Sequence, residues 1–109
     1  MAYDEDLAQQ MRDDLGPLPG LSETKMFGGI CFMLNGNMTC GVHKNGLMYR
    51  VGKPAHEEAL ALPGTKPMDF TGRPMRAFVD LPADCAEDDA TREKLTQMAV
   101  AFAGSLPGK

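Results

Sequence analysis

Apolar and polar residues alternate in short runs between Lys25 and Val51, and this pattern predicts antiparallel strands. Three turn signals separate the runs: Gly28-Gly29, Asn35-Gly36 and Asn45-Gly46. Such pairs favour tight hairpin turns, because the central positions of those turns need positive φ angles. The stretch therefore predicts a meander of four strands, near residues 22–27, 30–34, 37–43 and 47–51.

The turns also predict a register. A two-residue loop at Asn35-Gly36 would place Met33 opposite Met38 and Cys31 opposite Cys40. The third loop could hold two residues or four without changing the faces. One predicted face is apolar throughout, so we expect helices to cover it: Met26, Cys31, Met33, Met38, Cys40, Val42, Leu47, Tyr49 and Val51. The other face mixes large apolar and polar residues: Lys25, Phe27, Ile30, Phe32, Leu34, Thr39, His43, Met48 and Arg50.

Apolar residues at helical spacing predict three helices around this sheet. The first spans residues 4–15, a short second one follows Pro54 over 54–61, and the last covers about 88–103. Alternation in 66–70 and 75–81 predicts two more strands. The order helix, four strands, helix, two strands, helix (α-β4-α-β2-α) is typical of an α+β fold with an antiparallel sheet.

Several short motifs follow one another along the chain: Lys25-Met26-Phe27-Gly28-Gly29, Asn35-Gly36-Asn37-Met38, Gly46-Leu47-Met48-Tyr49-Arg50-Val51, Phe70-Thr71-Gly72-Arg73-Pro74-Met75-Arg76 and Ser105-Leu106-Pro107. In this order they resemble the TfoX N-terminal domain family, over a single domain that covers residues 1–109. The resemblance implies an antiparallel meander sheet with helices packed on one face, similar to YjbR-like and secretion-chaperone-like folds. It also implies a small regulatory module that acts in transcription or competence through protein partners, since the family takes its name from the Sxy/TfoX competence regulators.

The overall charge bears on the class of partner. The formal net charge is −4 and the sequence pI is about 5.0. A duplex-binding surface normally needs a basic face, so we expect no direct binding of nucleic acid. No apolar run is long enough to span a membrane and no signal-peptide pattern opens the chain. Three cysteines, an odd number, suit reduced thiols, and we expect a cytoplasmic protein.

The sequence offers little support for catalysis or metal binding. A site built from Cys31, Cys40, His43 and Cys85 would lack the CxxC spacing that chelating loops use. A nucleophilic cysteine needs a nearby base, and the apolar strand face provides none. Gly28-Gly29 lies between strands, whereas a phosphate-binding loop leads into a helix. We therefore expect no enzyme activity, no cofactor and no metal.

The segment around Arg73 and Arg76 is the best candidate for a binding loop. Two arginines so close together could hold a carboxylate or a phosphate. Together with Arg50 they form the predicted site of an alternative function, the binding of a small anionic ligand. Asp69 or Asp80 could instead pair with these arginines and stabilise the turn.

The predicted faces suggest two further hypotheses. If the helices cover the apolar face, the other face predicts a homodimer interface of Phe27, Ile30, Phe32, Leu34 and Met48. The competing interpretation is that residues 70–81 fold over this face within one chain. In the predicted register Cys31 and Cys40 lie opposite each other, within disulfide reach on mild oxidation.

Overall fold

The computed structural model describes residues 5–26, 29–44, 46–70 and 73–107, without the side chains of residue 26 and of residues 68–76. In these ranges three helices pack against a six-stranded antiparallel sheet, as the α+β prediction requires. Short 3₁₀ turns cover Lys53–Ala55 and Ala83–Cys85. The helices are α1 (Glu5–Leu15), α2 (His56–Leu60) and α3 (Asp89–Gly104), and the strands are β1 (Leu21–Met26), β2 (Gly29–Leu34), β3 (Asn37–His43), β4 (Gly46–Arg50), β5 (Lys66–Phe70) and β6 (Arg73–Pro82).

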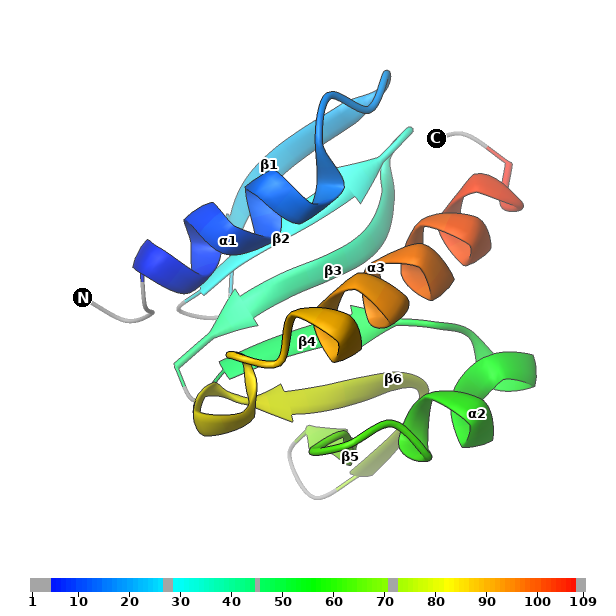
Figure 1. Ribbon diagram of the computed structural model, residues 1–109. Coiled ribbons are helices and arrows are strands. Elements are labelled where there is room, and N and C mark those ends of the chain that lie inside the picture. Colours follow the sequence, from blue (N-terminus) through cyan, green and yellow to red (C-terminus); the bar gives the residue numbers. More distant parts are fainter. Residues whose placement is uncertain (1–4, 27–28, 45, 71–72, 108–109) are drawn as a thin grey trace.

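The strands are ordered β1-β2-β3-β4-β6-β5. The predicted meander of the first four strands is confirmed, and β6 then inserts between β4 and the edge strand β5. The third loop holds two residues, because His43 pairs with Gly46. Figure 1 shows α1, α2 and α3 in front of the sheet, with α3 across its middle strands. The predicted layer of helices on one face is therefore present.

The two long helices form for reasons that the sequence shows. The predicted apolar stripe of α1 is buried through Leu7, Met11 and Leu15, together with Ala8. The helix α3 begins at an aspartate cap, where the Asp88 side chain accepts a hydrogen bond of 3.1 Å from the main-chain N–H of Thr91. Leu95 and Ala99 of α3 then bury their side chains against the sheet.

A β-bulge in β3 changes the faces of the sheet. Leu34 pairs with Asn37 and Met33 with Met38, as predicted, but Phe32 pairs with Cys40. Thr39 is therefore an extra residue in its strand, and its hydroxyl donates to the main-chain oxygen of Asn37 at 3.2 Å. One inserted residue reverses the face of every residue beyond it relative to the partner strand.

The predicted face of β2 is wrong for this reason, whereas the core positions predicted beyond the bulge are confirmed: Cys40, Val42, Leu47, Tyr49 and Val51. Ile30 and Phe32 lie on the helix-covered face and share one core cluster with Cys40, Val42 and Tyr49. The Phe32 side chain is 0% exposed. Because side chains alternate along a strand, Cys31 and Met33 of β2 lie on the opposite face, away from the helices.

Most residues of the predicted homodimer interface are therefore buried within the chain and are not available for a second copy. Ile30, Phe32 and Leu34 are buried within the single chain, and Met48 is 8% exposed. Phe27 lies outside the described residues.

The predicted cysteine pair is also corrected. Cys31 pairs with Gly41, so the thiols of Cys31 and Cys40 project from opposite faces of the sheet. Both are free and buried, and burial raises the pKa of each thiol.

Candidate functional site

Arg50, the last residue of β4, lies where that strand meets the end of α3. Its guanidinium carbon lies 5.3 Å from the centre of the Phe102 ring, and its Nη1 donates to the main-chain oxygen of Met38 over a long 3.5 Å. Its Nε is buried and has no hydrogen-bond partner among the described residues. No carboxylate in the described part of the chain pairs with this cation. The predicted site residue is therefore half-buried without a described counter-ion.

Gly52 permits this arrangement. Its backbone has φ +84°, a conformation that side chains disfavour, and a Cβ there would come within 2.5 Å of the Phe102 ring. The ring can thus lie directly against the chain after β4. Neither Gly52 nor Phe102 was predicted as a site residue, because their proximity depends on how α3 crosses the sheet.

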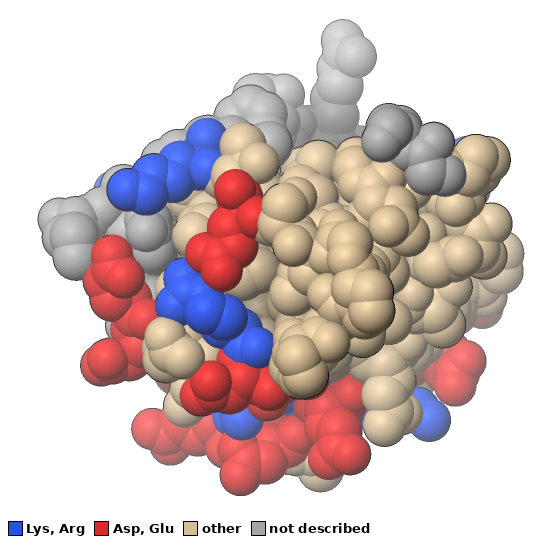
Figure 2. All heavy atoms as spheres, turned by 90° about the horizontal axis from the view of Figure 1, so that it is seen from above, with Lys and Arg blue, Asp and Glu red and all other residues tan. Residues whose placement is uncertain are grey.

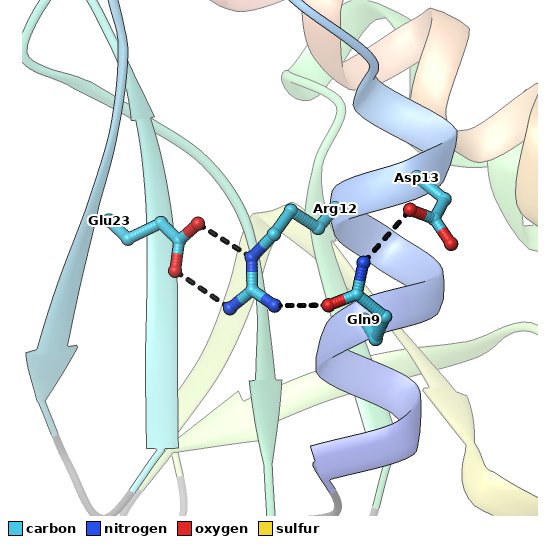
Figure 3. A network of polar contacts seen from close by, with 4 residues as sticks. All are labelled: Gln9, Arg12, Asp13 and Glu23. Atoms are coloured by element: carbon cyan, nitrogen blue, oxygen red, sulfur yellow. Dashed lines mark hydrogen bonds and ion pairs between the residues drawn. The ribbon is translucent and has the colours of Figure 1, made fainter.

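Arg12, by contrast, is an arginine whose guanidinium is fully hydrogen-bonded within the chain. It also lies over a phenylalanine, with its guanidinium carbon 5.9 Å from the centre of the Phe32 ring. It forms two hydrogen bonds to the Glu23 carboxylate, of 2.7 and 2.8 Å, and a third to Gln9. Figure 3 shows this network, which Asp13 extends and which links α1 to β1. Arg12 therefore has a structural role at the sheet edge.

Arg92 is likewise occupied. Its Nε donates to Asp14 at 3.0 Å, and its Nη1 contacts the Asp89 carboxylate and the main-chain oxygen of Ala86. A polar hollow of about 480 Å³ adjoins this group, lined by Asp14, Asp89, Arg92, Glu93, Thr96 and Gln97. The guanidinium of Arg92 is already paired with these carboxylates. We therefore interpret the hollow as part of the contact between α1 and α3, in which Arg92 binds Asp14; we call this contact the clasp.

The other two predicted binding arginines are described through their backbone alone. Arg73 pairs with Phe70 near the β5–β6 turn. Arg76 precedes Ala77, whose main-chain oxygen accepts hydrogen bonds from the N–H groups of Val51 and Gly52. The register therefore brings the backbone of Arg76, more than that of Arg73, near Arg50. Their side chains, and that of Asp69, lie outside the described part of the structure.

His43 and Asp80 form a pair that sequence reasoning missed. His43 Nε2 lies 2.5 Å from Asp80 Oδ1, although 37 residues separate them in the chain. The pairing follows from the insertion of β6 beside β4, which no local motif signals. The predicted pairing of Asp80 with Arg73 or Arg76 stays a prediction, because those two side chains lie outside the described part of the structure. Within the described ranges, histidines, cysteines and acidic residues form no cluster that could hold a metal.

Uncharged segments gather at one end of the molecule, beside Arg50. The N–H of Asn35 donates to the oxygen of Gly20 at 2.9 Å, and the Asn37 amide donates to the oxygen of Pro107 at 2.9 Å. Figure 2 views this end and shows a broad surface free of charged side chains, with acidic residues beside it. We call it the uncharged end; its apolar, at least partly accessible residues are Pro17, Leu18, Pro19, Leu21, Leu106 and Pro107.

A family model, the TfoX N-terminal domain, matches residues 13–103. The chain belongs to the TfoX N-terminal domain family. The match includes Arg50, Gly52 and Phe102, and most of the segments that form the uncharged end. No protein of curated function and no solved structure was found to match the chain. Among the described residues of this TfoX N-terminal domain, no helix has the length and apolar character needed to cross a membrane.

Proposed function

We propose that this TfoX N-terminal domain is a non-enzymatic interaction module that acts in transcriptional or competence regulation through a protein partner. The observation that carries the proposal is the uncharged end, because the buried core of a protein–protein interface is depleted of charged residues. Family membership supports the regulatory setting.

The loops at the uncharged end adopt tight turns and are joined by a hydrogen bond, which favours a surface formed before binding. Gly16, Gly20 and Gly36 adopt positive φ angles, as does Asn35 at +53°. The hydrogen bond from Asn35 to Gly20 joins two of its loops. A preformed surface loses little conformational entropy on binding.

Affinity capture with the tagged chain tests this proposal. We expect recovery of RNA polymerase or a transcription regulator, and loss of that recovery in the variant Pro19→Asp/Pro107→Asp. Both prolines are exposed, so the changes add charge at the uncharged end without opening the core. Ala61→Asp, at an exposed position after α2, is the matched control. Failure to recover any component of the transcription machinery would contradict the proposal.

A second candidate function is the binding of a small anionic ligand at Arg50, with Arg73 and Arg76 as predicted contributors. The observation that favours it is the absence of a described counter-ion at Arg50. A thermal-shift screen with phosphate, sulfate, mono- and dicarboxylates tests it. Saturable stabilisation by one anion would support this function, and no stabilisation by any of them would reject it.

Two further predictions accompany these proposals. A homodimer remains a prediction, although most of the surface proposed for it lies in the core. Sedimentation equilibrium decides whether a dimer forms. Kinship with YjbR-like and secretion-chaperone-like folds also remains a prediction.

A further inference from the structure

Arg50 differs from the other arginines whose side chains the structure describes. Arg12 is paired with Glu23, and Arg92 with Asp14 and Asp89. Arg50 has one long hydrogen bond to a carbonyl and a ring beneath it. Partial burial of a charged group costs free energy when no counter-ion is bound to it. An anionic ligand that forms charge-assisted hydrogen bonds with the Arg50 guanidinium would offset this cost.

The surroundings of Arg50 restrict what that anion can be. Residues 26–43 and 95–108 contain no Lys, Arg, Asp or Glu, and they supply Met38 and Phe102 beside the guanidinium. Asn37 connects this region to Pro107 and hence to the uncharged end. Met38 and Phe102, the described residues that contact the guanidinium, carry no charge, so among the described contacts the Arg50 cation is the charged group that a ligand would meet.

Charge favours a monoanion over a dianion. The chain carries a formal net charge of −4, and Asp80, the nearest acid along β6, is paired with His43. A phosphate dianion would leave one of its charges without a described cation. A single carboxylate matches the planar guanidinium fork in both charge and geometry.

We propose that Arg50 and Phe102 form a binding site for a small monocarboxylate with an apolar body. The carboxylate accepts hydrogen bonds from the guanidinium, and the apolar body lies against Phe102 and the neighbouring uncharged surface. The proposal rests on the anion-binding function given above and narrows its ligand to one chemical class.

Titration of the ¹⁵N-labelled full chain with benzoate and with hexanoate tests the proposal. We expect saturable shifts of the Arg50 side-chain and Phe102 amide signals. Benzamide, which has the shape of benzoate without its charge, should bind much more weakly. Equal shifts with benzamide, or no saturable shift with either carboxylate, would overturn the proposal.

Variants separate this site from general effects. Arg50→Gln should lower the affinity for benzoate about tenfold or more, since a hydrogen bond to a charged group is lost. Arg50→Lys keeps the charge without the fork and should weaken binding less, and it serves if Arg50→Gln does not fold. Arg12→Gln is the matched control and should bind as the wild type does. Unchanged affinity in both Arg50 variants would overturn the proposal.

Inorganic phosphate distinguishes failure of this inference from failure of the broader function. If phosphate binds at Arg50 and the monocarboxylates do not, the site binds anions but the inferred ligand class is wrong. If no anion in the screen binds, both are wrong.

Discussion

Arg12 and Arg50 both lie over a phenylalanine ring, yet their roles follow from what else they contact. Arg12 on α1 forms two hydrogen bonds to Glu23 on β1, so its guanidinium is already paired within the chain. Arg50 faces a carbonyl and an aromatic ring. The sequence suggested Arg50 as a site residue from its type and position. It could not show that Arg12 and Arg92 pair with carboxylates, whereas no described carboxylate pairs with Arg50.

The Arg12–Glu23 pair predicts a pH dependence of stability. The hydrogen bond from Arg12 lowers the pKa of Glu23 from its ordinary value of 4.5. A carboxylate with a lowered folded pKa stabilises the fold above the unfolded pKa, and this contribution is lost as pH falls through the folded pKa. We expect the coupling between Arg12→Gln and Glu23→Gln in a double-mutant cycle of urea unfolding to be present at pH 7 and lost towards pH 3. Equal coupling at both pH values would contradict this pairing.

The three cysteines predict an order of reactivity. Cys31 and Cys40 are buried with raised pKa values, whereas Cys85 is half-buried. Because the thiolate is the reactive form, alkylation of the native protein at pH 8 should label Cys85 first. Mild oxidation should give no link between Cys31 and Cys40, whose side chains leave opposite faces. Peptide mapping after each treatment checks both results, and a Cys31–Cys40 disulfide would restore the register first predicted.

At the level of elements, local signals predicted most of the fold. Asn35-Gly36 correctly fixed the pairs on either side of its turn, and apolar spacing correctly predicted both long helices. The face of β2 relative to that of β3 could not be predicted, because Thr39 looks like an ordinary strand residue in the sequence. The bulge at Thr39 is evident only in the structure, where it lets Ile30 and Phe32 of β2 lie in the same core as Cys40 and Val42 of β3.

The bulge makes Phe32 a core residue, and this is testable. Phe32→Ala should lower the free energy of unfolding by about 3–5 kcal/mol, and Phe32→Asp should prevent folding, because it would bury an unpaired charge. Met33→Ala, at a half-buried position on the opposite face, is the control and should cost less. Urea unfolding followed by circular dichroism measures these effects. A folded Phe32→Asp chain would contradict the core assignment.

At the scale of the whole molecule, charge is unevenly distributed. A broad surface at one end lacks charged side chains, and both acidic and basic residues lie beside it (Figure 2). The sequence showed the acidic balance and the uncharged stretches separately. It could not show that stretches distant in the chain meet through Asn35 and Asn37.

This charge distribution predicts weak contact with nucleic acid. We expect no sequence-dependent, submicromolar binding of duplex DNA by the chain at physiological salt, since the formal charge is −4. Fluorescence anisotropy with specific and scrambled duplexes checks this. Tight binding to one duplex that a scrambled sequence does not share would contradict it.

The clasp between Arg92 and Asp14 has a consequence for how the chain is made. The two residues are 78 positions apart, and they join α1 to α3. During synthesis the hairpins of β1 to β4 can pair as soon as they leave the ribosome, because their contacts are local. The helix α1 must then wait for α3 before its contacts are complete. A nascent chain therefore carries an incompletely covered apolar sheet face until α3 has emerged, and it is most exposed to aggregation during this interval.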